Sequence, residues 1–104
     1  MIYEERDYRI RAGKLAEFVK LYGEHGLPIQ KEHLGAFVAY FTTEFGELNH
    51  VVAIWGYESL NHRAETRKAM LAEPRWQSYL SMVDGLIDVQ NTRVLTPVAY
   101  SPLQ

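Results

Sequence analysis

The chain has 104 residues, 47% of them hydrophobic, and a formal net charge of −2. A chain of this length forms one domain with a modest core, so we expect a single domain over residues 1–104. Basic residues are scattered rather than clustered, which argues against nucleic acid or an anionic membrane surface as a partner. Because cysteine is absent, disulfides, thiolate catalysis and cysteine-bound metals are excluded.

The N-terminal residues 1–7 contain no apolar segment of the kind that forms a secretory signal. Nor does the chain contain about 18 consecutive apolar residues, which a membrane-spanning helix would need. Together with the absence of cysteine, these features predict a cytoplasmic protein that does not contact a membrane.

Strand and helix patterns alternate along the chain. The first strand is expected at Ile2–Ile10, and Gly13 separates it from a helical region over residues 14–33. Gly26 suits the C-terminal end of a first helix in this region, and Pro28 suits the start of another helical turn. The apolar stripe of the region recurs at helical spacing and consists of Leu15, Phe18, Val19 and Tyr22.

The middle of the chain predicts a β-hairpin. Residues 36–45 are rich in β-branched and aromatic side chains, and residues 48–57 form a second such run. Gly46 lies between the two strands and suits the turn that joins them. We expect the side chain of Asn49 to cap the backbone of this turn rather than to bind a ligand.

Two helices and a strand complete the pattern. Ser59 is a good N-cap for a helix over residues 60–72, and Pro74 suits the first turn of another helix over residues 74–84. The last strand is expected at residues 86–95. The resulting βαββαβ order predicts an α+β, ferredoxin-like sandwich.

Both faces of the middle strands are apolar. In the third strand, strict alternation separates Val51, Ala53, Trp55 and Tyr57 from Val52 and Ile54. In the second strand, it separates Phe37, Ala39 and Phe41 from Val38 and Tyr40. A sheet with helices on one side should be polar on its free side, so we expect a second copy of the chain to cover that side as a homodimer. The alternative is that aromatic residues at the strand ends lie under the C-terminal tail.

Several segments resemble the NIPSNAP family, and together they span nearly the whole chain. The N-terminal Glu4-Glu5-Arg6-Asp7-Tyr8 is similar to the family's opening Glu-x-Arg-x-Tyr. Further similar segments are Tyr40-Phe41-Thr42-Thr43-Glu44, Trp55-Gly56-Tyr57-Glu58-Ser59-Leu60 and Pro74-Arg75-Trp76-Gln77-Ser78-Tyr79-Leu80. The most specific feature is the combined spacing of Asn49, Trp55, Tyr57, Ser59, Arg63 and Trp76.

This resemblance implies a dimeric α+β barrel, which agrees with a sheet that is apolar on both sides. The wider superfamily includes cofactor-free oxygenases, haem-degrading enzymes and small isomerases, whereas membership of the NIPSNAP family implies no defined reaction. Without a transit-like extension, the chain is similar to stand-alone, bacterial-type members. It departs from the family at Glu5, where an apolar residue is usual, and at Ala12, where proline is usual. The first departure bears on the shape of the barrel mouth.

The first strand is the most unusual element, because the central strand of such a sheet is normally apolar. Alternation puts Glu4, Arg6 and Tyr8 on one face. In a functional interpretation, Arg6 and Tyr8 line a cavity between sheet and helices and hold an acidic or enolic ligand, since arginine offers a fork of donors and tyrosine a hydroxyl. The alternative is an internal ion-pair network that fixes the strand register, or charges at an open barrel rim.

Aromatic and basic side chains extend this candidate site. Tyr40, Trp55, Tyr57 and Trp76 are candidates for a pocket that receives a flat organic ligand, although such residues also form cores and interfaces. Arg63 and Arg67 lie one helical turn apart. These two arginines could contact an anion, but we expect them to pair at the surface with neighbouring glutamates, namely Glu65 and Glu73.

The four histidines lack the spacing of a metal site, and we expect neither a metal nor a cofactor. His50 is the candidate proton carrier, since imidazole titrates near neutral pH. Alternation places His50 on the strand face of Val52 and Ile54, where a structural role is the alternative.

Two functions stay open at this point. The first is a homodimeric enzyme or binding protein in which Arg6 and Tyr8 orient a small acidic or aromatic ligand. Any reaction would be of a cofactor-free oxygenase or isomerase type. The second is a non-catalytic structural or protein-interaction module whose aromatic residues serve only packing.

Overall fold

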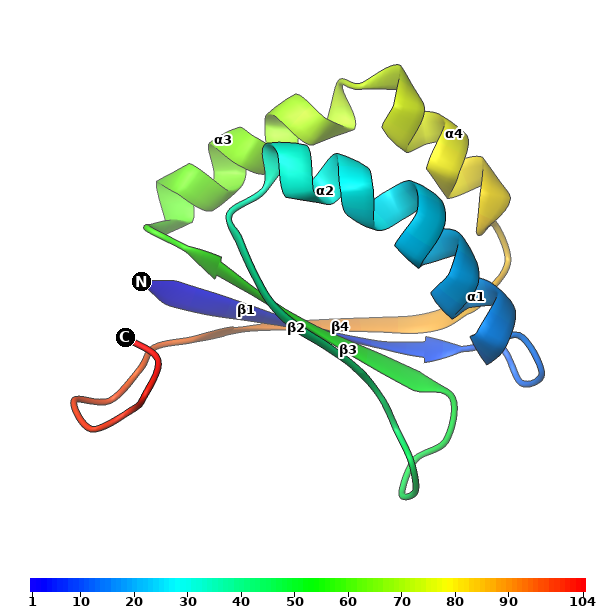
Figure 1. Cartoon of the computed structure of the whole chain (residues 1–104), viewed down its shortest axis with the longest axis horizontal. Coiled ribbons are helices and arrows are strands. Elements are labelled where there is room, and N and C mark those ends of the chain that lie inside the picture. The colour runs from blue at the N-terminus through cyan, green and yellow to red at the C-terminus, as the bar shows by residue number, and fades with distance from the viewer.

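The computed structural model describes all 104 residues and confirms the α+β, ferredoxin-like architecture. Four antiparallel strands form one sheet in the order β2-β3-β1-β4. The strands are β1 (Ile2–Ile10), β2 (Ala36–Thr42), β3 (His50–Tyr57) and β4 (Ile87–Leu95). All of the helices lie on one face of this sheet (Figure 1). The charged strand β1 is therefore central, as its place in the βαββαβ order predicts.

The first helical region is continuous, but it contains a π-helical turn. The helices of the chain are α1 (Leu15–Leu21), η1 (Tyr22–Gly26), α2 (Leu27–His33), α3 (Leu60–Leu71) and α4 (Pro74–Met82). The prediction that Gly26 ends a helix is wrong, because the backbone stays helical through this residue. Gly26 instead permits close packing, since a Cβ atom here would lie 2.7 Å from Cζ of Tyr79. Pro28 lies in the first turn of α2, as predicted.

The second helical region begins at the predicted cap. The Ser59 hydroxyl accepts a hydrogen bond from the backbone N–H of His62 at 3.0 Å, which satisfies one of the free donors at the start of α3. Pro74 opens α4, as predicted. No helix of the protein is both long enough and apolar enough to cross a membrane.

The second strand does not alternate strictly, because β2 contains a β-bulge. Phe37 lies opposite Trp55, whereas Ala39 lies opposite Ile54, so one extra residue is inserted between the two pairs. Phe37 and Tyr40 consequently both face the helices. The predicted grouping of Phe37 with Ala39 is therefore wrong, while the alternation predicted for β3 is confirmed by the burial of its helix-facing residues.

The connection between β2 and β3 is longer than the predicted tight turn. The first of these strands ends at Thr42 and the second begins at His50. Gly46 has a φ of +99° and Asn49 a φ of +65°, both in the left-handed region. The expected side-chain cap from Asn49 does not form. Its backbone carbonyl instead accepts a hydrogen bond from the Ile10 N–H at 2.7 Å, which ties the loop to β1.

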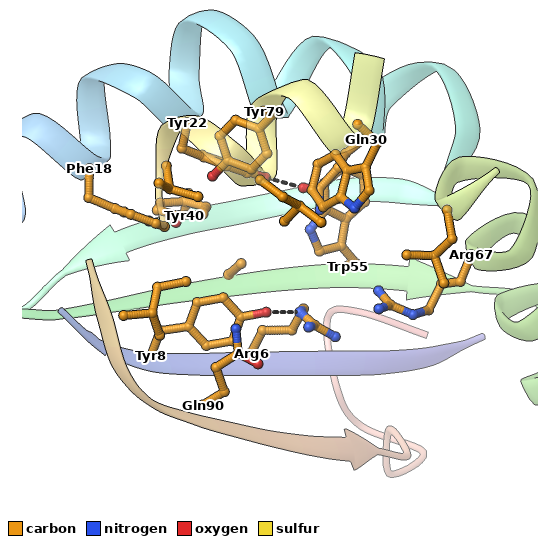
Figure 2. A pocket seen from close by; sticks show the side chains of 16 residues that line it. Arg6, Tyr8, Phe18, Tyr22, Gln30, Tyr40, Trp55, Arg67, Tyr79 and Gln90 are labelled. Carbon is orange, nitrogen blue, oxygen red and sulfur yellow. Dashed lines mark hydrogen bonds between the residues drawn. The ribbon is translucent and has the colours of Figure 1, made fainter. Parts of the chain in front are cut away.

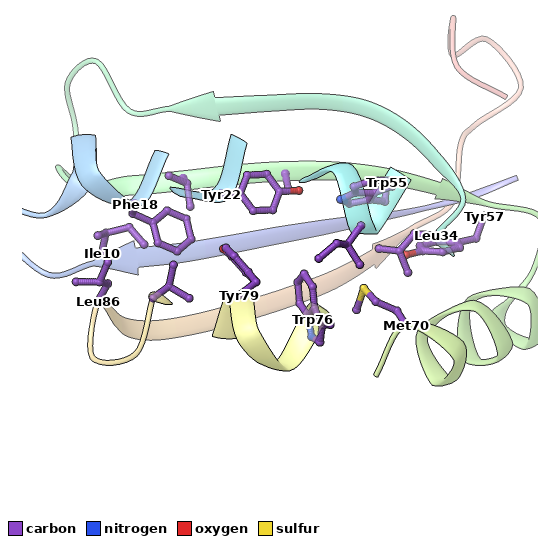
Figure 3. Close-up of a cluster of buried hydrophobic side chains, with 14 residues drawn as sticks. Ile10, Phe18, Tyr22, Leu34, Trp55, Tyr57, Met70, Trp76, Tyr79 and Leu86 are labelled. Carbon is purple, nitrogen blue, oxygen red and sulfur yellow. The ribbon is translucent and has the colours of Figure 1, made fainter. Parts of the chain in front are cut away.

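The core fills the space between the sheet and the helices (Figure 3). Its largest fully buried side chains are those of Trp55, Tyr57, Phe18, Ile10, Met70, Glu4 and Val51. Glu4 is the exception in this apolar group, since its side chain is only 1% exposed. A buried carboxylate is costly unless cations pair with it, so Glu4 marks the part of the core where charge is concentrated.

The opposite face of the sheet carries no helix (Figure 1). The C-terminal tail crosses one end of it, where the Tyr3 hydroxyl donates a hydrogen bond to the backbone carbonyl of Gln104 at 3.0 Å. A hollow of about 490 Å³ lies between the tail and the sheet. Phe41 lines this hollow and is still 57% exposed. The tail thus covers only part of the apolar surface that the sequence predicts.

Candidate functional site

A cavity of about 200 Å³ lies between the sheet and the helices (Figure 2). Residues from all four strands and from all five helical segments line it. The structure brings together here five residues proposed from the sequence as ligand contacts, namely Arg6, Tyr8, Tyr40, Trp55 and Trp76. The other aromatic candidate, Tyr57, does not line the cavity. Their shared orientation follows from the sheet, because the strand residues among them all project from its helix-facing side.

Arg6 is held in place from both sides along its own strand. Its Nε donates a hydrogen bond to the Tyr8 hydroxyl at 2.6 Å, and its Nη1 donates one to Oε1 of Glu4 at 3.1 Å. Burial alone would lower the pKa of Arg6, but Tyr8 and Glu4 outweigh that effect and raise the pKa above its usual value. Arg6 is therefore a fixed, fully charged group on the cavity floor.

Glu4 is shared between two arginines. Besides the bond from Arg6, its other carboxylate oxygen accepts a hydrogen bond from Nε of Arg63 on α3. The expectation that Arg63 pairs with surface glutamates is wrong, because α3 turns this side chain toward the sheet. The ion-pair network considered for the first strand therefore exists, and it extends across to a helix.

Arg67 lies one helical turn after Arg63 and lines the cavity. It was also expected to pair at the surface, yet it makes no side-chain hydrogen bond and no ion pair. Burial, followed by the positive charge of Arg6, lowers the pKa of Arg67 below its usual value. Three guanidinium groups thus lie near one carboxylate, that of Glu4, and the site has an excess of positive charge.

Tyrosines form much of the remaining wall. Tyr22 stacks on Tyr40 with ring centroids 4.7 Å apart and meets Tyr79 edge-on. The Tyr22 hydroxyl donates a hydrogen bond to Oε1 of Gln30 at 2.5 Å. Burial is the main cause that raises the pKa of Tyr22, Tyr40 and Tyr79, so all three hydroxyls remain neutral at physiological pH.

One buried donor in the cavity wall has no partner. Trp55 is 0% exposed, and its indole Nε1–H makes no hydrogen bond. Buried polar groups in proteins are almost always satisfied, so an orphaned donor beside a cavity indicates a place where a ligand or water acceptor can bind. Trp76 contributes ring surface to the same cavity.

His50, the candidate proton carrier, lies on the opposite face of the sheet and does not reach the cavity. Its Nδ1 is 2.6 Å from Oδ1 of Asp7, and its Nε2 is 3.2 Å from a carboxylate oxygen of Glu47. Both ring nitrogens are thus occupied by contacts that join the β2–β3 loop to β1. This geometry supports the structural alternative for His50.

An additional charged cluster joins α2 to the start of α4, and the sequence spacing did not reveal it. Glu32, His33 and Glu73 lie close together, and Arg75 donates hydrogen bonds to both carboxylates. These hydrogen bonds, first from Arg75 and then from His33, lower the pKa of Glu73. The cluster is therefore an ion-pair network between helices.

Arg67, Tyr22, Tyr79 and Gln30 are among the cavity residues that the sequence interpretation did not assign to the ligand site. The tyrosines lie on apolar helix stripes and were attributed to the core alone. For Arg67 the sequence gives no clear signal, because α3 segregates apolar and polar residues poorly; only the structure shows that Met70, three residues further on, is fully buried.

Comparison with known proteins identifies relatives across the whole chain. The NIPSNAP family model matches residues 3–102. The NipSnap protein of Drosophila melanogaster is 35% identical over 103 residues, which cover 99% of this chain and 37% of that protein. A solved NIPSNAP family protein with unknown function from Agrobacterium tumefaciens is 41% identical, with a TM-score of 0.97, and the match covers 100% of this chain and 94% of that one.

A more distant solved structure, of an antibiotic biosynthesis monooxygenase, has a TM-score of 0.64 at 16% identity and covers 94% of this chain and 99% of its own. At that identity the similarity shows the fold alone. The chain spans less than half the length of the Drosophila relative, so the activity of the longer protein does not transfer directly. The family match over residues 3–102 and the near-identical solved fold agree with each other. The chain belongs to the NIPSNAP family.

Proposed function

We propose that this protein binds a small organic anion with an aromatic or apolar body in the cavity between sheet and helices, and that it does so as a homodimer. One observation carries the ligand proposal: the cavity region holds the guanidinium groups of Arg6, Arg63 and Arg67 but only the carboxylate of Glu4. An anionic ligand would supply the missing negative charge.

The excess of positive charge at this site carries a cost in free energy. Partly buried cations are unfavourable unless an opposite charge or several acceptors offset their lost hydration. A guanidinium group matches the planar geometry of a carboxylate or enolate, with two parallel hydrogen bonds. The stacked rings of Tyr22 and Tyr40 offer a wall for the flat body of the same ligand.

The chemistry of the cavity favours binding over acid–base catalysis. No aspartate, glutamate or histidine lines it. The buried tyrosines keep their protons because their pKa values are raised, and the arginines keep their charge. Any reaction at this site would rely on the arginines to stabilise an anion of the substrate, with a proton acceptor from outside the cavity.

The dimer proposal rests on the open face of the sheet. Phe41, Val38 and Val89 are exposed there in the single chain, next to the half-buried Val52 and Ile54. An apolar patch on a sheet face is normally covered, and a second copy related by a two-fold axis covers it without a further partner. The lack of acid–base groups in the cavity also supports the second candidate, a non-catalytic interaction module that assembles through this face.

A thermal-shift screen tests the ligand proposal. Aromatic carboxylates, phenols and short aliphatic acids would be compared with neutral amides of matched shape. We expect acids to raise the melting temperature with increasing concentration, because a ligand that binds only the folded state stabilises it. Arg6→Ala should abolish the shift, whereas Arg93→Ala, which removes an equal charge that pairs with Glu5 on the open face, should retain it.

Two results would reject the proposal of an anion site. Neutral amides that stabilise the protein as well as the acids do would show that charge is not recognised. A complete absence of shifts across the panel would favour the interaction module.

A further inference from the structure

We infer that Arg67 and the indole N–H of Trp55 form the end of the cavity that receives the ligand's carboxylate, and that the ligand is an aromatic monocarboxylate with a single ring. This inference rests on the proposed function, since it assigns an orientation and a size class to the same anion. Three features of the cavity support it: two donors without partners, the presence of cations at one end only, and the small volume.

The donors of the two cavity arginines differ in their availability. Arg6 already donates through Nε to Tyr8 and through Nη1 to Glu4. Arg67 donates to no side chain, so its whole planar fork is free for a ligand. The binding of a carboxylate in two parallel hydrogen bonds needs such a fork. Arg67 is therefore the group best placed to anchor the carboxylate.

Trp55 provides a second free donor at the same end of the cavity. It lies directly opposite Glu4 in the pairing of β3 with β1, and Glu4 contacts both Arg6 and Arg63. Its N–H is fully buried and unpaired, which is unfavourable until an acceptor reaches it. Figure 2 shows Arg67 extending from α3 toward Arg6, with Trp55 above them on the helix-facing side of the sheet.

The other end of the cavity holds no cation for a second charge. Arg6 and Arg67 are the only charged residues that line the cavity, and the apolar Phe18 lies at the opposite end from Arg67 in Figure 2. A dicarboxylate would have to bury its second charge there without a cation to offset the lost hydration. The cavity therefore selects one carboxylate attached to an apolar body.

The volume limits that body to one ring. A cavity of about 150 Å³ is enough to hold a benzene molecule. The cavity here measures about 200 Å³, which leaves room for a carboxylate beside one ring but not for a second fused ring. The rings of Tyr22 and Tyr40 stack on each other and form one wall of this space.

Calorimetric titration of the full chain tests both parts of the inference. The probes are benzoate, benzamide as the neutral analogue, terephthalate as the dicarboxylate and 2-naphthoate as the two-ring acid. We expect benzoate to bind about tenfold or more tightly than the other three, since each loses a charged hydrogen bond, buries an unpaired charge or exceeds the volume. If 2-naphthoate bound as tightly as benzoate, the limit to one ring would be wrong. If terephthalate did so, the limit to one carboxylate would be wrong.

Arg67→Gln is the matching variant, and Lys68→Gln is its control, because Lys68 is exposed on the same helix and loses the same charge. We expect Arg67→Gln to weaken benzoate about tenfold or more and to leave benzamide unchanged, whereas Lys68→Gln changes neither by more than about twofold. Arg67→Lys keeps the positive charge but lacks the planar guanidinium, so it should lower the affinity for benzoate by an intermediate factor. It replaces Arg67→Gln as the test if that variant does not fold.

The outcomes separate this inference from the proposed function. If the wild type binds aromatic acids and Arg6→Ala abolishes binding while Arg67→Gln and Arg67→Lys do not weaken it, the carboxylate lies at Arg6 and the inference is wrong. If the wild type binds none of the acids, the proposed function fails and the inference fails with it. Trp55→Phe should weaken benzoate more than benzamide, and an equal effect on both ligands would remove Trp55 from the carboxylate site.

Discussion

The charged residues of β1 have different surroundings on the two faces of the sheet. On the open face, Glu5 pairs with Arg93, Asp7 with His50 and Arg9 with Asp88. On the helix face, Glu4 is shared by two arginines and a third arginine has no partner. Each charged residue of β1 on the open face has an oppositely charged or imidazole partner, whereas Arg67 on the helix face has none. The comparison teaches that one strand can carry charges that are all paired on one side of a sheet and charges that contribute to an unpaired excess on the other.

The largest expected effect comes from Trp55→Asp, which places a carboxylate in the fully buried core on the helix face. Loss of the indole packing alone should cost about 3–5 kcal/mol, and the buried charge adds to this. We expect the variant to be largely unfolded, as measured by urea denaturation and circular dichroism. A variant that kept the wild-type melting temperature would show that Trp55 does not lie between sheet and helices.

Glu4→Gln and Glu5→Gln each remove one carboxylate, from the helix face and the open face respectively. Their effects on the free energy of unfolding compare the two faces directly. Glu4→Gln leaves Arg6 and Arg63 without their shared partner, and we expect it to reduce the free energy of unfolding by about 3 kcal/mol. Glu5→Gln breaks a pair whose arginine is mostly exposed, and we expect a loss below about 1 kcal/mol. Denaturant midpoints at equal protein concentration measure both. Equal losses would mean that the two faces do not differ in burial of charge.

The third prediction concerns the apolar part of the open face. Phe41→Asp should weaken the proposed homodimer by about 2 kcal/mol or more, roughly thirtyfold in its dissociation constant, since interface aromatics dominate binding. The fold of each chain should persist, because Phe41 is exposed in the single chain. Sedimentation velocity over a concentration series measures the effect. A wild-type protein that remains monomeric at tens of micromolar would reject the dimer itself.

The sequence was sufficient to predict the fold because several local signals agree. The βαββαβ order, the Ser59 cap and the period-two pattern of β3 each depend on a few neighbouring residues, and the structure confirms them. The same period placed Arg6, Tyr8 and Trp55 on one face, where they meet at the cavity. A regular strand fixes which side each residue faces, so period-two inference worked for β1 and β3.

The parts that could not be predicted depend on tertiary packing. The bulge in β2 shifts the alternation between Phe37 and Ala39, and no Gly or Pro marks it in the sequence. Arg67 lies on α3, where apolar and polar residues are poorly segregated, so the sequence does not define which face meets the sheet. Gly26 was interpreted as a helix end because its true role, contact with Tyr79, involves a distant residue.

The smallest expected effect, a change of stability with pH, also distinguishes the two faces. Tyr22 and Tyr79 are buried on the helix face, where burial raises their pKa above the ordinary value of about 10. The folded state therefore keeps protons on these two tyrosines, and on Tyr40 and Tyr57, whose pKa values burial also raises, while the unfolded chain loses them above pH 10. Their contribution to stability is constant below that pH and decreases as pH rises beyond it. The limiting slope of the unfolding free energy is about 1.4 kcal/mol per pH unit for each tyrosine.

Tyr22→Phe should reduce this slope by the contribution of one tyrosine, whereas Tyr100→Phe, at a site 90% exposed, should leave the slope unchanged. Denaturant unfolding between pH 9 and 11, with tyrosinate absorbance as a second readout, measures the slope. If Tyr22→Phe left the slope at the wild-type value, the Tyr22 hydroxyl would be ionising in the folded protein, and the cavity would be too well hydrated to favour an apolar anion.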